Sequence, residues 1–165
     1  MTKLAHGRIA PPTRGFTLLE ILLVVAAIGI LAGIVIVAIN PAKQLGDTKN
    51  AQRRTDVNSV INAVYQYALD NNGSFPTGID SVFTSAQVLG TDTTGCDTTC
   101  TATTTVASCL NLTATLVPTY VVGIPLDPGS GTAAKTDYYI DRGADGRLAV
   151  GSCDPEQGAV IEVRR

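Results

Sequence analysis

Residues 14–39, RGFTLLEILLVVAAIGILAGIVIVAI, contain a run from Ile21 to Ile39 in which every residue is apolar or glycine. With Phe16, Leu18 and Leu19 in front of it, this run is long enough for a helix to cross a hydrocarbon core of about 30 Å. A buried core helix is the alternative, but the roughly 125 residues that follow would have to cover it on every side. The run therefore predicts a membrane-spanning helix over residues 16–40.

A cleaved secretory signal peptide is a second alternative for this N-terminus. Such a signal has a shorter apolar stretch, and its small-x-small cleavage site follows that stretch. Here the run is longer and ends in Asn40-Pro41, whereas Arg14-Gly15 comes before it. This order favours a short leader that is removed in front of a helix that stays with the protein.

The leader, residues 1–15, is basic and holds Lys3, Arg8, Arg14 and the only histidine, His6. Without three of the twelve basic residues the chain keeps 9 basic and 14 acidic side chains, a net charge of −5. Nucleic-acid binding needs a basic patch, so this charge argues against it. Catalysis that needs an imidazole is excluded for the processed chain.

After Pro41 the apolar residues recur every three or four positions, as on one face of a helix. Polar residues fill the other faces of this segment: Asn50, Gln52, Arg53, Arg54, Asp56, Asn58 and Asn62. Asn72-Gly73-Ser74 and Pro76 provide a stop, and Asn40-Pro41 and Gly46 predict a loosened or kinked connection to the apolar run. We expect an amphipathic helix over residues 41–72 whose apolar stripe comprises Val57, Val60, Ile61, Val64, Tyr65, Ala68 and Leu69.

Residues 73–165 are richer in turn residues and in short β-type segments. Turn sequences such as Asp127-Pro128-Gly129 and Gly143-Ala144-Asp145-Gly146 separate these segments, which predicts an antiparallel meander. The fold class is therefore α+β, with a long N-terminal helix packed against a small antiparallel sheet. The predicted strands are Tyr120–Val122, Tyr138–Ile140, Arg147–Val150 and Ala159–Val163.

Four cysteines, Cys96, Cys100, Cys109 and Cys153, allow three pairings. Their spacing fits no zinc pattern, so disulfides in an oxidising compartment are the better interpretation, with free thiols as the alternative. Three of them lie in a Thr-rich stretch, residues 91–115, for which we expect an exposed, stapled loop. The predicted pairs are Cys96 with Cys100 and Cys109 with Cys153.

The junction Arg14-Gly15-Phe16-Thr17-Leu18-Leu19-Glu20 resembles the N-terminal signature of type IV pilins and type II secretion pseudopilins. The resemblance implies a pilin-like fold, cleavage after Gly15 by a membrane-embedded prepilin peptidase, and N-methylation of the new N-terminus, Phe16. It also implies an inner-membrane precursor that an assembly platform and its ATPase polymerise with other copies into a filament outside the cytoplasm. The cysteines support the same side for the C-terminal part.

Glu20 is the one charged residue within the apolar helix. A carboxylate at the edge of a membrane span costs on the order of 2–3 kcal/mol and should have a partner. The resemblance implies that its partner is the Phe16 amine of a neighbouring subunit, which would fix the subunit's axial register. The alternative is a solvated acid that complements the helix dipole.

No catalytic signature, phosphate-binding glycine loop or metal cluster stands out, so we expect no enzyme. The predicted function is a structural subunit of a type IV pilus. A major pseudopilin of a type II secretion system is the first alternative, and a membrane-anchored extracytoplasmic binding protein is an alternative of another class. We expect no cofactor except for a weak calcium possibility: the resemblance to major pseudopilins implies calcium near Asp137, Asp141 and Asp145, although turn aspartates are the simpler interpretation.

Overall fold

The computed structural model describes residues 15–79 and 85–165. The predicted leader, apart from Gly15, lies outside the described residues, and the predicted cleavage site after Gly15 is at the edge of this range. Two helices come first, α1 (Leu18–Ile39) and α2 (Pro41–Asp70). Asn40 separates them with a left-handed backbone at φ 45°, so the predicted interruption at Asn40-Pro41 is confirmed. The chain divides into two compact units, residues 1–41 and a globular unit, residues 42–165.

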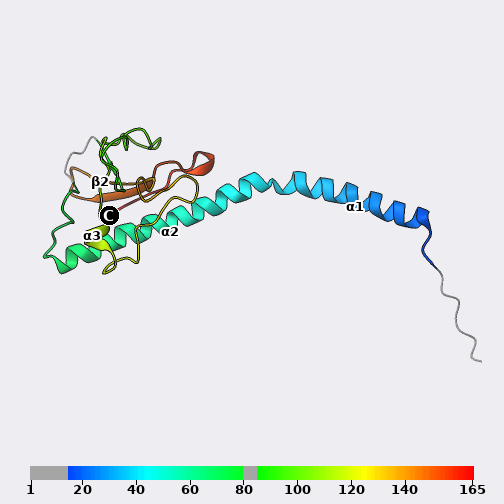
Figure 1. The fold of residues 1–165 in the computed structure, drawn as a ribbon, viewed down its shortest axis with the longest axis horizontal. Helices are drawn as coiled ribbons and strands as arrows, with labels where there is room; N and C mark the ends of the chain where they lie inside the picture. The colour runs from blue at the N-terminus through cyan, green and yellow to red at the C-terminus, as the bar shows by residue number, and fades with distance from the viewer. Residues whose placement is uncertain (1–14, 80–84) are drawn as a thin grey trace, which may run out of the picture. The chain divides into compact units, whose positions relative to one another are not determined.

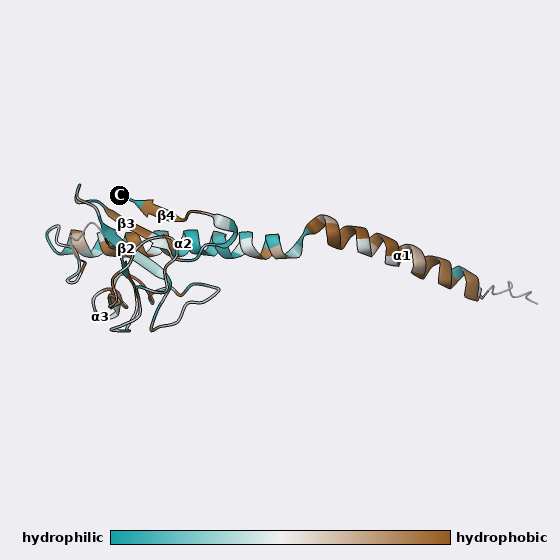
Figure 2. Cartoon of the chain, turned by 90° about the horizontal axis from the view of Figure 1, so that it is seen from above, coloured by the Kyte–Doolittle hydropathy of each residue, from teal (hydrophilic) through white to brown (hydrophobic). Residues whose placement is uncertain are grey.

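Helix α1 begins with an N-cap: the Thr17 Oγ1 atom accepts a hydrogen bond from the Glu20 backbone N at 3.2 Å. All 22 of its residues are exposed, and Figure 2 shows it as an almost continuously hydrophobic helix. It is long and apolar enough to cross a membrane. The sequence-based prediction of an apolar N-terminal helix is confirmed.

Helix α2 ends where the sequence predicted, because Asn72 and Gly73 both adopt positive φ and the Gly73 N donates to the Ala68 carbonyl at 2.7 Å. The prediction of a loosened turn at Gly46 is wrong. Gly46 lies inside α2 and is buried, and an added Cβ there would come 2.5 Å from the Gln157 Nε2 atom. This glycine permits close packing of the segment around Gln157 on the helix.

The sheet contains four antiparallel strands in the order β1 (Gln87–Val88), β2 (Tyr138–Arg142), β3 (Leu148–Ser152) and β4 (Glu162–Arg164). In the globular unit it packs on α2, as Figure 1 shows, and the shared core contains Val57, Ile61, Val64, Ile140, Leu148 and Val150. Strand register pairs Ile140 with Val150 and Val150 with Val163. The α+β fold class and the antiparallel meander are confirmed.

Three details of the predicted sheet differ from the structure. The segment Tyr120–Val122 is no strand: it follows the short helix α3 (Thr113–Leu116) as a turn, in which the Tyr120 N donates to the Leu116 carbonyl at 2.8 Å. Strand β1 was not predicted, because it is two residues long and pairs with β2 far along the chain. Strand β4 is shorter than expected, since Ile161 turns into the core and only Glu162–Arg164 pair with β3.

Candidate functional site

The residues of the predicted processing and assembly site lie together at the start of α1. Gly15 and Phe16 precede the helix, Phe16 is 80% exposed, and Glu20 is in the first turn. The first-turn carboxylate lies where the positive end of the helix dipole favours it. Phe16 and Glu20 are one helical turn apart in sequence, and both face solvent in the single chain. They are therefore available to groups outside the chain.

The helix that follows them contributes an apolar surface that the chain itself leaves uncovered. Its large side chains have exposed fractions from 47% at Val24 to 83% at Val37. Soluble monomers rarely expose contiguous apolar patches larger than a few hundred Å². The geometry of α1 therefore requires lipid or other protein around it.

Within the globular unit, the segment around Asp127 is fixed to α2 by a buried ion pair that the sequence did not predict. Arg53 is 2% exposed, and its Nε and Nη2 atoms donate to both carboxylate oxygens of Asp127, Nη2 at 2.9 Å. Asp127 also accepts from the Gly129 backbone N at 2.7 Å. Arg53 was assigned to the polar side of the helix, but it precedes Val57 by four residues, so helical spacing places it on the apolar stripe.

Charge and hydrogen bonds set the protonation of this pair. Burial alone would raise the Asp127 pKa, but the Arg53 guanidinium and the backbone N–H groups of Gly129 and Ser130 hold it below its ordinary value. The hydrogen bond to Asp127 raises the pKa of Arg53. Both groups are charged at neutral pH, and the pair ties the segment after the loop 117–126 to α2.

A second attachment joins the C-terminal segment to the first turns of α2. The Asn50 side chain donates to the Glu156 carbonyl at 2.9 Å and accepts from the Glu156 backbone N at 3.0 Å. The Lys49 Nζ atom lies 3.1 Å from the Glu156 carboxylate, and the Gln157 Nε2 atom donates to the Lys43 carbonyl at 2.7 Å. Asn50 and Arg53 thus use one side of α2 to hold two different loops.

All four cysteines form disulfides, but the predicted pairing is wrong. The bonds join Cys96 with Cys109 and Cys100 with Cys153. The Thr-rich stretch folds back on itself, and the Cys96 N donates to the Ala107 carbonyl at 3.0 Å, which brings Cys109 to Cys96. The Ala102 N donates to the Cys153 carbonyl at 3.1 Å, which places Cys100 beside β3. The spacing of the cysteines in the sequence gives no information about these long-range hydrogen bonds, so it could not predict the pairing.

The Thr-rich stretch is stapled by disulfides and mostly exposed or half-buried, as expected, but a few of its residues are buried. Cys96 is fully buried, Thr105 is 6% exposed, and the Thr105 Oγ1 atom donates to the Cys96 carbonyl at 2.9 Å. Ala86 and Thr105 form an isolated parallel bridge. The disulfides therefore hold the stretch as a folded lobe with its own small core.

The calcium candidates do not converge. Asp137 is 5% exposed at a positive φ, Asp141 lies in β2, and Asp145 lies in the β2–β3 turn, where its Oδ1 atom accepts from the Arg147 N at 3.0 Å. Burial raises the pKa of Asp137, which disfavours its charged form. Within residues 15–79 and 85–165, no three acidic, histidine or cysteine side chains gather as a metal site.

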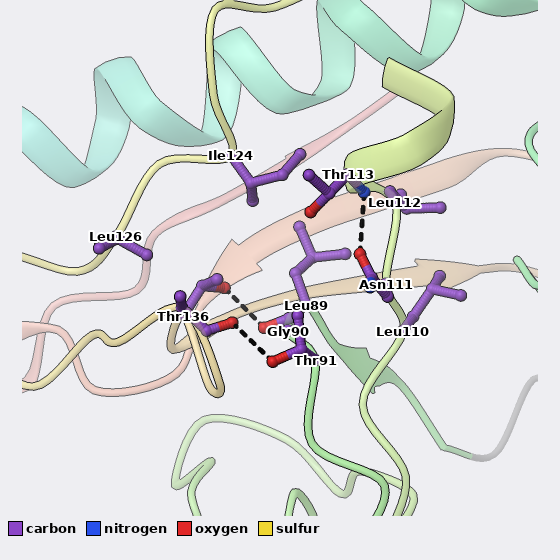
Figure 3. Close-up of a pocket in the computed structure, with 11 residues that line it drawn as sticks. Leu89, Gly90, Thr91, Leu110, Asn111, Leu112, Thr113, Ile124, Leu126 and Thr136 are labelled. Atoms are coloured by element: carbon purple, nitrogen blue, oxygen red, sulfur yellow. Dashed lines mark hydrogen bonds between the residues drawn. The ribbon is translucent and has the colours of Figure 1, made fainter. Parts of the chain in front are cut away.

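A hollow of about 320 Å³ lies between Leu89, the start of α3 and the segment 124–136. Figure 3 shows its apolar walls and its polar side chains, which bond within the chain: the Thr136 Oγ1 atom donates to the Leu89 carbonyl at 2.8 Å, and Asn111 Oδ1 accepts from the Thr113 N at 3.0 Å. Titratable side chains are absent from the lining that the structure describes. This cavity offers no acid–base group for catalysis.

Comparison with known protein families concerns the N-terminal segment of the chain. Residues 12–36 match the family model described as the prokaryotic N-terminal methylation motif. The chain therefore carries a prepilin-type N-terminus, and the resemblance to pilins and pseudopilins that the sequence indicated is confirmed.

Three curated relatives are each named type II secretion system core protein G. The protein of Escherichia coli K12 is 37% identical over 78 residues, 46% of this chain and 52% of that protein. Those of Pectobacterium carotovorum and Aeromonas hydrophila are 37% and 38% identical, over 41% of this chain and 42% and 48% of theirs. The chain thus spans about half the length of the relatives it matches. No solved structure matches it significantly.

Proposed function

We propose that this protein is a structural subunit of a membrane-rooted helical filament and has no enzymatic activity. The observation that carries the proposal is α1, a 22-residue apolar helix exposed along its whole length, in a chain whose globular unit has a core of its own. Lipid covers such a helix in the precursor. Other copies of the same helix cover it after assembly, and the globular units then form the outer surface.

Processing precedes assembly in this proposal. A prepilin peptidase cuts after Gly15 on the cytoplasmic side, and the new Phe16 amine is methylated. The Glu20 carboxylate of a neighbouring subunit then pairs with that amine. An inner-membrane platform and its ATPase drive the polymerisation. The exposed positions of Phe16 and Glu20 before and within the first turn of α1 support this sequence of events.

Within the class of filament subunits, we propose a major pseudopilin of a type II secretion system. The three relatives named type II secretion system core protein G support it over the type IV pilus that the sequence favoured. The pilus stays the second candidate, because the disulfide-bonded Thr-rich lobe is the kind of variable surface feature expected of a pilin. We propose no calcium role for Asp137, Asp141 and Asp145, since no three acidic, histidine or cysteine side chains of the described residues gather as a metal site. A membrane-anchored binding protein is disfavoured as a candidate function, because it would not explain the motif Gly15–Glu20.

The test is electron microscopy of sheared cell-surface and periplasmic material, with the subunit identified by N-terminal sequencing. The expected subunit begins at N-methylated Phe16, and Gly15→Val, which puts a side chain into the protease cleft, leaves uncut precursor in the membrane. Deletion of the gene should abolish secretion of folded proteins and leave surface pili intact. Loss of pili with normal secretion would instead establish the second candidate.

A further inference from the structure

Two short segments of the chain match the acceptor pattern for N-linked glycans, Asn-x-Ser/Thr with x other than proline. They are Asn72-Gly73-Ser74 and Asn111-Leu112-Thr113. A triplet of this kind occurs often by chance, so the residue types alone do not mark a modification site. The folded surroundings of the two triplets differ, however, and this difference distinguishes them.

The triplet at Asn72 lies in the turn that follows the last residue of α2, and all three of its residues are exposed. Asn72 has a positive φ of 55°, which asparagine tolerates better than most residues. Two backbone hydrogen bonds hold the turn, from the Gly73 N to the Ala68 carbonyl at 2.7 Å and from the Ser74 N to the Asn71 carbonyl at 3.0 Å. The side chains of Asn72 and Ser74 make no hydrogen bond with another residue in the described ranges 15–79 and 85–165, so both are accessible.

The triplet at Asn111 is tied to the core of the globular unit. Its middle residue, Leu112, is 2% exposed and belongs to the core that the sheet shares with α2. The Asn111 Oδ1 atom accepts a hydrogen bond from the Thr113 N at 3.0 Å. The preceding residue is fixed as well, because the Leu110 N donates to the Val88 carbonyl at 2.8 Å. Asn111 and Thr113 are exposed, but the backbone that joins them is anchored.

A glycosyl transferase has to take the asparagine and the hydroxyl into one concave active site, so the acceptor segment must lift away from the domain. Local opening costs least where few apolar contacts and few backbone hydrogen bonds are lost. At Asn72 the opening breaks the two hydrogen bonds of a helix end, and none of the three residues leaves the core. At Asn111 the opening pulls Leu112 out of the core. The folded structure therefore favours Asn72 as the acceptor.

We propose that Asn72 is an N-glycosylation site and that Asn111 is not. The donor is an oligosaccharide joined to a membrane lipid through pyrophosphate. The Asn72 Nδ2 atom forms a bond to the anomeric carbon of the first sugar, the bond from that carbon to the pyrophosphate oxygen breaks, and the lipid pyrophosphate leaves with the electron pair. The transferase takes one proton from Nδ2 and recognises the Ser74 hydroxyl. The reaction needs the globular unit outside the cytoplasm, which its two disulfides support, but it does not depend on filament assembly.

Mass spectrometry of the subunit purified from its own cells tests this proposal. Peptide mapping with fragmentation should find a glycan on the Asn72 side chain and the Asn111 peptide at its unmodified mass. Ser74→Ala should remove the glycan completely, whereas Ser74→Thr should keep it, because threonine also carries the recognition hydroxyl. Asn72→Asp, whose new side chain also tolerates a positive φ, should lose the glycan. Asn111→Asp is the matched control and should keep it.

Each variant should keep both disulfides in non-reducing peptide mapping, which shows that it folds. An unmodified Asn72 in the wild-type subunit would overturn the proposal, and so would a glycan carried by Ser74 or Asn111 instead. A glycan that persists in Ser74→Ala would contradict the assigned acceptor triplet. Sheared filament yield, measured on the same cells, separates this proposal from the filament function, because a glycosylated subunit that forms no filaments would overturn the filament function alone.

Discussion

The apolar side chains of helix α1 are exposed, whereas the core side chains of the globular unit are buried. In the globular unit Val57, Ile61 and Leu148 are completely buried, and even a guanidinium and a carboxylate find partners inside the protein. In α1 the large apolar side chains are at least 47% exposed, and the one acid lies in the first turn. The globular unit is stabilised by its own contacts, while the surroundings of α1 come from outside the chain. Substitutions in the two regions should therefore have different consequences.

The largest effect on the globular unit should come from Asp127→Asn. It leaves the Arg53 guanidinium buried without a counter-charge, which costs about 3–5 kcal/mol of unfolding free energy. Urea unfolding of the detergent-solubilised chain, followed by tyrosine near-UV circular dichroism, measures it. Arg53→Met combined with Asp127→Asn is the control and should recover part of the loss, because the uncompensated charge is gone.

The same pair sets a pH dependence. The folded-state pKa of Asp127 is below its ordinary value, so its contribution to stability is fully present above the unfolded-state pKa of about 4 and is lost as the pH falls through the folded-state value. Wild-type unfolding free energy should drop below about pH 4. The unfolding free energy of Asp127→Asn should drop less over that range. Parallel curves of unfolding free energy against pH for the two proteins would show that Asp127 is not the source of the pH dependence.

The contributions of the two disulfides to stability should rise with the logarithm of the lengths of the loops that they close. In the chain-entropy model the 53-residue separation of Cys100 and Cys153 corresponds to ~4 kcal/mol, and the 13-residue separation of Cys96 and Cys109 to ~3 kcal/mol. Replacing each pair with serines and comparing urea midpoints checks this order. Non-reducing peptide mapping must also recover these two pairs and not Cys96–Cys100.

Glu20→Ala should have the smallest effect on the unfolding free energy of the globular unit, a change close to zero. It should still abolish filament assembly. The variant should insert normally, because a charge is removed from the span. In the filament the Phe16 ammonium of each subunit would lack its partner among apolar helices, and that cost recurs at every added subunit. The amounts of the variant subunit in the membrane fraction and in the sheared-filament fraction are compared with those of the wild type. Normal filaments would show that Glu20 only complements the helix dipole.

Local patterns in the sequence predicted the parts of the fold that local interactions determine. Residues that are neighbours in the sequence determine the apolar run, the stop at Asn72-Gly73 and strands β2 and β3. The Cys96–Cys109 bond and strand β1 depend on hydrogen bonds between distant segments. Arg53 was predicted on a polar face because its residue type outweighed its position, although helical spacing aligned it with Val57. The N-terminal site was predictable because its residues are contiguous.

The central claim, that copies of α1 cover one another, is tested most directly by thiol labelling of filaments. Ile34 is 61% exposed in the single chain and is replaced in the variant Ile34→Cys, and Val122→Cys, at a position 95% exposed on the globular unit, serves as the control. In sheared filaments a water-soluble maleimide should label position 122 and leave position 34 unlabelled until detergent dissociates the subunits. Labelling of position 34 in intact filaments, at the rate of position 122, would contradict the account.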